Sequence, residues 1–94
     1  MRIRFYIDPD TGLPHFYGHN VDEEEVIDVL RKPIEETRGR RNSTIAIGRT
    51  RAGRHLKVIY VSDRTADGIF VITAFDLSTA QLRALRRRLR RRGK

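Results

Sequence analysis

One cluster of basic side chains in this sequence could do chemistry on a phosphate group. His55 stands among Arg49, Arg51, Arg54 and Lys57. Guanidinium and ammonium groups beside an imidazole can hold a phosphate and stabilise negative charge that develops on it. The same residues could instead form a solvated hairpin tip, where basic side chains keep a strand edge from pairing with another chain. The sequence alone leaves both interpretations open.

The other two histidines, His15 and His19, lie four positions apart. Imidazole titrates near neutral pH, so His19 is a candidate general acid or base. It could equally form a hydrogen bond with the backbone where the next helix begins. Two histidines with no carboxylate at a distinctive spacing are a weak basis for a metal site, and the sequence has no cysteine. We therefore expect neither a metal nor another cofactor.

Positive charge is concentrated at the C-terminal end. The formal net charge is +8, and residues 77–94 contain eight basic residues and no acidic one, so the rest of the chain is formally neutral. Arginine makes bidentate contacts with phosphate, which favours nucleic-acid binding over the alternative of a disordered solubilising tail. The candidate nucleic-acid-binding residues are Arg83, Arg86, Arg87, Arg88, Arg90, Arg91 and Arg92.

Two helices are predicted from the residues that begin them. Asp22 and Glu25 have the spacing of a capping box, and acidic residues fill the following turn, which predicts a helix over residues 22–32. Ser78 and Gln81 repeat that spacing at the start of a second helix. This second helix has a narrow stripe of leucines surrounded by arginines, so one edge of it can pack while the rest faces solvent or a partner.

Alternating or β-branched runs predict the strands. The predicted strands cover residues 2–7, 34–38, 43–48, 56–62 and 69–75. The linkers between the last three are short and polar, which favours antiparallel hairpins. Residues 13–20 are predicted to be a loop. Alternation along the fourth strand puts His55 and Lys57 on the same face of the sheet.

These elements predict an α+β fold in which a small, mostly antiparallel sheet of three to five strands is flanked by an N-terminal and a C-terminal helix. We expect one domain over residues 1–94, with a core over about 1–85 and a basic helix and tail over about 78–94. Removing residues 86–94 should change thermal stability little, since exposed charges usually matter within about 0.5 kcal/mol. The sequence has no signal-peptide pattern and no long apolar run, so we expect a cytoplasmic protein without a membrane partner.

Several segments are similar to a known family. They are Asp8-Pro9, His19-Asn20-Val21, Glu25-Val26, IGRT and AGRHLKVIYV (47–50 and 52–61) and VITAF (71–75). Across residues 5–80 the chain resembles the BrnT-type toxins of bacterial toxin–antitoxin modules, and a looser set of small proteins with the same layout. The resemblance implies a RelE-like ribonuclease fold, metal-independent RNA cleavage, a protein antitoxin as partner and contact of the toxin–antitoxin complex with DNA.

The chain departs from this family pattern at three positions. Ile7 replaces a tryptophan, Gly18 a lysine and Phe75 an arginine. The loss of two cations favours the alternative of a non-catalytic module that binds nucleic acid or an antitoxin. For the endoribonuclease, a histidine would act as acid or base and the cations would stabilise the transition state. The candidate catalytic residues are His19, Arg49, Arg51, Arg54, His55 and Lys57.

Overall fold

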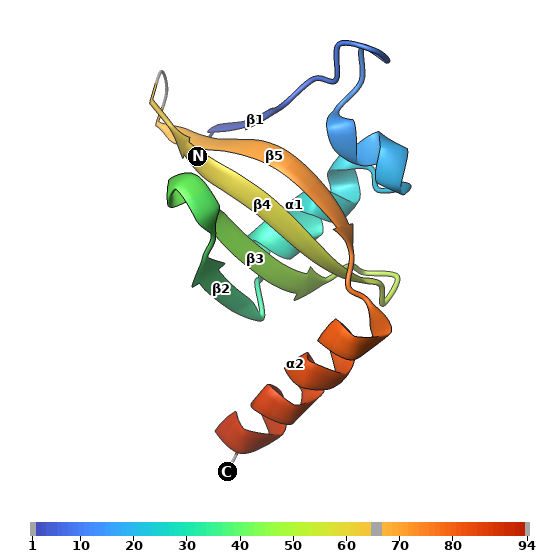
Figure 1. Cartoon of the computed structure of the whole chain (residues 1–94), viewed down its shortest axis with the longest axis vertical. Coiled ribbons are helices and arrows are strands. Elements are labelled where there is room, and N and C mark those ends of the chain that lie inside the picture. The colour runs from blue at the N-terminus through green and yellow to red at the C-terminus, as the bar shows by residue number, and fades with distance from the viewer. Residues whose placement is uncertain (1, 65–66, 94) are drawn as a thin grey trace.

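The computed structural model describes residues 2–64 and 67–93, which form a mixed α+β fold (Figure 1). The elements in chain order are β1 (Arg2–Phe5), η1 (His15–His19), α1 (Glu23–Arg31), β2 (Glu35–Arg38), η2 (Arg40–Asn42), β3 (Thr44–Arg49), β4 (His55–Asp63), β5 (Gly68–Asp76) and α2 (Thr79–Arg92). Here η1 and η2 are short 3₁₀ segments. The described part of the chain contains no helix that is long and apolar enough to cross a membrane.

The sheet has five strands in the order β1-β5-β4-β3-β2. Neighbouring strands from β2 to β5 are antiparallel, as predicted, and β1 adds a parallel pairing along β5. The edge strand predicted over 34–38 is present as β2 at one edge of the sheet. The first strand ends at Phe5 rather than residue 7, and Ile7 makes an isolated bridge with Pro14.

The prediction of a loop over residues 13–20 was wrong for residues 15–19. Residues His15–His19 form η1, and Phe16 is buried among the core residues. Its ring meets the Phe5 ring edge-on, with centroids 5.4 Å apart. Asn20 closes the turn in the left-handed region with φ 62. A single buried ring gives no periodic pattern, so this packing could not be seen in the sequence.

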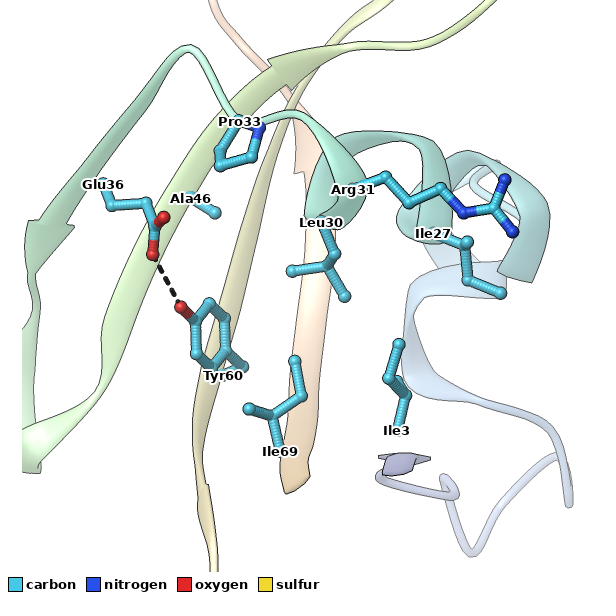
Figure 2. A pocket seen from close by; sticks show the side chains of 9 residues that line it. All are labelled: Ile3, Ile27, Leu30, Arg31, Pro33, Glu36, Ala46, Tyr60 and Ile69. Atoms are coloured by element: carbon cyan, nitrogen blue, oxygen red, sulfur yellow. Dashed lines mark hydrogen bonds between the residues drawn. The ribbon is translucent and has the colours of Figure 1, made fainter. Parts of the chain in front are cut away.

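Helix α1 begins with the predicted capping box. The Glu25 amide donates to the Asp22 carboxylate at 2.9 Å, and the Asp22 amide donates to the Glu25 carboxylate at 3.1 Å. Val26 and Val29 face the sheet and are fully buried. Glycine lets the helix approach closely, because a Cβ atom on Gly48 would lie 3.0 Å from Val29 Cγ1. A groove of about 560 Å³ remains beside the helix, lined largely by apolar side chains (Figure 2).

The opposite face of the sheet is here called the open face, and Figure 1 looks onto it with α1 behind the strands. Helix α2 leaves the end of β5 and runs past the end of the sheet toward β2. Its predicted capping box is present, with hydrogen bonds of 3.1 and 2.9 Å between Ser78 and Gln81. Leu85 is fully buried.

Part of the arginine run holds α2 in place. The Glu35 side chain is 3% exposed and accepts two hydrogen bonds of 2.8 Å from Arg88 and one of 2.7 Å from Arg92. Hydrogen bonding by Arg88, opposed by burial and helped by the charges of both arginines, holds the pKa of Glu35 below its ordinary 4.5. The helix continues to Arg92, so residues 86–92 are not a frayed tail.

This anchor revises the expectation that deletion of residues 86–94 is neutral for stability. The deletion leaves Glu35 buried without its partners, so we expect it to lower the free energy of unfolding by about 1–2 kcal/mol more in the wild-type protein than in Glu35→Gln. Urea denaturation measures both values. Equal losses in the two backgrounds would show that the anchor contributes nothing. Because the folded pKa is lowered, the stabilisation is present above pH 4.5 and is lost as the pH falls through the folded pKa.

Candidate nucleic-acid interface

Strand register brings cationic, imidazole and aromatic side chains together at the hairpin end of the open face, where β3 turns into β4. Arg49 pairs with His55 across the hairpin, and Lys57 pairs with Phe75 of β5. The Lys57 ammonium lies 4.8 Å from the centroid of the Phe75 ring, a cation–π distance. His55 and Lys57 are two residues apart on one strand and therefore share a face.

Segment η1 adds two imidazoles to the edge of this site. The His19 ring lies 5.6 Å from the Phe75 ring and 5.3 Å from the His15 ring. The His15 ring is held in turn, because its Nδ1 lies 3.0 Å from the Thr73 hydroxyl. His19, Phe75, Lys57 and His55 thus lie along one path across the sheet, which we call the basic–aromatic strip.

Sequence reasoning included three residues of the basic–aromatic strip and missed the one that connects them. Phe75 occupies a position where the family pattern usually has an arginine. Its contacts with both His19 and Lys57 depend on the register of β5 and on the position of η1. The support that Thr73 gives to His15 depends on the same two features. The spacing of residues in the sequence predicts neither the register of β5 nor the position of η1.

The electrostatic surroundings of His55 favour its neutral form. Burial lowers the pKa of its imidazole, and the nearby charges of Arg49 and Arg86 lower it further. A histidine whose pKa lies below its ordinary value is unprotonated at neutral pH, so its ring nitrogen can accept a proton. Within the strip, His55 is therefore the candidate general base.

Arg54 differs from the rest of the predicted cluster because its guanidinium binds carboxylates and carbonyls of the protein itself. Its guanidinium donates to the Asp76 carboxylate at 2.7 and 2.9 Å and to the Glu25 carboxylate at 3.1 Å. It also donates to the backbone carbonyls of His19 and Asn20. Hydrogen bonding to Asp76 is the main reason that the pKa of Arg54 is raised. Every guanidinium nitrogen has a protein partner, so in this structure Arg54 joins these segments to one another.

Arg51 also lies away from the strip. Its backbone N–H donates to the Asp28 carboxylate of α1 at 3.1 Å, and its side chain pairs with the same carboxylate at 3.4 Å. This places Arg51 on the α1 side of the molecule, where its side chain is 82% exposed. Arg49 is exposed and acts electrostatically on His55. Of the six predicted catalytic residues, the structure brings together His19, Arg49, His55 and Lys57.

The arginines of α2 fall into three groups. Arg88 and Arg92 point inward to Glu35, while Arg86 lies near enough to lower the pKa of His55. The remaining arginines are exposed, and among residues 2–64 and 67–93 they form no ion pair: Arg83, Arg87, Arg90 and Arg91. They recur three or four positions apart, so they form one outward face of the helix.

Metal ligands do not gather in the described residues. No group of three or more histidine, aspartate or glutamate side chains there is placed to hold a metal ion. His15 and His19 contact each other through their rings, and the partners that surround them are aromatic rings and a hydroxyl. What these side chains offer is proton transfer, stacking and positive charge.

The structural role of Arg54 can be tested by its removal. Arg54→Ala should lower the free energy of unfolding by about 2–3 kcal/mol, because Glu25 and two carbonyls lose their donor. Arg54→Lys should recover part of this loss, since an ammonium cannot bind a carboxylate in the bidentate manner of a guanidinium. Arg51→Ala is the control, and its exposed ion pair should be worth less than about 0.5 kcal/mol. Urea denaturation of the three variants would contradict the assignment if Arg54→Ala were as stable as the wild type.

The surroundings of His55 predict its titration. In an NMR pH titration its pKa should lie below the ordinary 6.5, and Arg49→Gln or Arg86→Gln should raise it. Arg83→Gln, which removes a charge from the outward face of α2, should leave it unchanged. The fold favours the neutral ring, so this group stabilises the protein above pH 6.5 and the contribution is lost as the pH falls. A pKa above 6.5 would remove His55 as the candidate base.

Comparisons of the chain with protein-family models, with curated proteins and with solved structures found no match.

Proposed function

We propose that the protein binds RNA along the basic–aromatic strip and cleaves it without a metal, as the toxin-like endoribonuclease of a toxin–antitoxin module. The observation that carries the proposal is the path of His19, Phe75, Lys57 and His55 across one face. A stacking ring, a cation and two imidazoles are what a single-stranded RNA segment requires for binding and for proton transfer.

The reaction can be written with these side chains alone. Neutral His55 takes the proton of a ribose 2′-hydroxyl, and the oxygen attacks the adjacent phosphorus. The bond from phosphorus to the 5′-oxygen breaks, which leaves a 2′,3′-cyclic phosphate on one product, and protonated His19 donates its proton to the departing oxygen. Lys57 and Arg49 stabilise the additional negative charge on the phosphate in the transition state. Phe75 stacks on a base and holds the RNA in position.

The outward arginines of α2 add affinity. Each contact between arginine and phosphate releases counterions, and such contacts carry no sequence information. Arg83, Arg87, Arg90 and Arg91 are exposed for this purpose. The module assignment rests on the sequence resemblance, which implies an antitoxin partner and contact of their complex with DNA.

A non-catalytic RNA-binding module is the second candidate. The observation that favours it is the engagement of Arg54 and Arg51 with carboxylates, which leaves fewer cations to stabilise a transition state than the sequence suggested. Binding would then use the same strip and the same helix, but no bond would break.

Cleavage of a single-stranded RNA by the purified protein in the presence of EDTA tests the proposal. We expect products with 2′,3′-cyclic phosphate ends, and a loss of about 10²–10³ in rate for His55→Gln and for Lys57→Ala. The rate should rise with pH below 6.5, where His55 loses its proton. Lys32→Ala removes a lysine at the far end of α1 and is the matched control, expected to keep the wild-type rate.

The same preparations separate the two candidates. Retained RNA binding without cleavage by the folded wild-type protein would contradict the enzyme and leave the binding module. Absence of both would overturn the whole proposal. Whether or not the protein cleaves RNA, Arg83→Gln with Arg87→Gln should weaken RNA binding and reduce its dependence on salt, because contacts with phosphate are lost.

A further inference from the structure

The end of the open face away from the hairpin has an aliphatic floor. Ile45, Ile59, Val61 and Ile72 line a hollow of about 330 Å³, and Ile72 is 36% exposed. An irregularity in the pairing of β4 with β5 falls between Ile59 and Tyr60, which lets Ile72 join this surface. We call these four residues the aliphatic patch.

Arginines surround the aliphatic patch. Arg40 and Arg41 of η2 line the hollow, and Arg64 lines an adjoining hollow that shares Val61. Within the described ranges none of the three forms an ion pair. The backbone holds this rim at a conformational cost, because Arg41 lies in the left-handed region with φ 55. Asn42 follows it there with φ 63.

The chemistry of the floor argues against nucleic acid as its occupant. Bases stack on aromatic rings, and the four floor residues are aliphatic. The nearby Phe70 ring is covered by the Arg4 guanidinium at 5.3 Å, which is itself bound to Asp63. The rim argues against a second copy of this chain, because a symmetric contact between two patches would oppose arginines with arginines.

We propose that the aliphatic patch binds an acidic amphipathic segment of a partner protein. Apolar side chains of the segment would cover Ile59 and Ile72, and its carboxylates would pair with Arg40 and Arg41. Ile59 is two residues from Lys57 on β4, about 7 Å along the strand. A segment on the patch therefore adjoins the basic–aromatic strip and hinders access of a large ligand to it. The binding surface itself does not depend on whether the protein acts on RNA.

The groove beside α1 is larger but identifies no partner (Figure 2). Its charged lining is one arginine, Arg31, and one carboxylate, Glu36, which accepts a 2.8 Å hydrogen bond from Tyr60. A rim with one charge of each sign has no preference for the charge of an occupant. The aliphatic patch differs because the three arginines of its rim all carry positive charge.

A synthetic helix-forming peptide with leucines on one face and glutamates on the other is the probe, and a peptide with lysines in place of the glutamates is its counterpart. We expect the acidic peptide to bind in fluorescence anisotropy and the basic one not to bind. Ile72→Glu should weaken binding by at least about tenfold, since a carboxylate would be buried against leucine. Arg40→Ala with Arg41→Ala should weaken it and reduce its salt dependence. Leu13→Glu, at another exposed apolar residue, is the matched control and should bind as the wild type does.

Three results would overturn the proposal, with folding of each variant checked by circular dichroism. One is equal affinity of the acidic peptide for the wild type and Ile72→Glu. Another is a wild-type dimer in light scattering that Ile72→Glu converts to monomer, which would make the patch an interface between copies. The third is a loss of single-stranded RNA binding in Ile72→Glu that is as large as its loss of peptide binding. Peptide binding by a protein that does not bind RNA would support this proposal and contradict the proposed function.

Discussion

The arrangement of the site depends on the ion pairs of Arg54. This side chain joins the end of β5 through Asp76, the first turn of α1 through Glu25, and the end of η1 through two backbone carbonyls. Three segments that are distant in sequence are thereby held at the β3–β4 turn. The position of His19 against Phe75 follows from this arrangement, because one belongs to η1 and the other lies beside Asp76. Charge alone suggests Arg54 as a phosphate ligand, and in the folded chain its guanidinium is bonded to protein groups that it holds together.

The arginine run of α2 shows the same division between structure and surface. Two of its members neutralise the buried carboxylate of Glu35, and the others face solvent. Helical periodicity separates the two groups, since residues three or four positions apart share a face. The net charge of +8 therefore overstates the number of arginines that α2 can offer to a polyanion. The docking of α2 depends on Glu35, a residue of the edge strand β2, together with the buried Leu85.

The open face is divided between two chemistries along the same strands. Toward the hairpin, Lys57 and Phe75 combine charge with an aromatic ring. Two residues further along β4, Ile59 begins the aliphatic patch, whose rim is again basic. A sheet covered by a helix on one side alone exposes such alternating side chains, and their types decide what can bind. Proximity of the two surfaces means that occupation of one affects access to the other.

The sequence by itself determined the features that arise within a few residues. Both capping boxes, the strand segments, and the shared face of His55 and Lys57 follow from local spacing and alternation. Tertiary structure decided the parallel pairing of β1 with β5, the turn of η1 around Phe16, and the partners of the arginines. Arg54 meets Asn20 across 34 positions and Arg88 meets Glu35 across 53. An arginine side chain is compatible with solvent, phosphate or carboxylate, so its role is set by which group the folded chain brings within hydrogen-bonding distance.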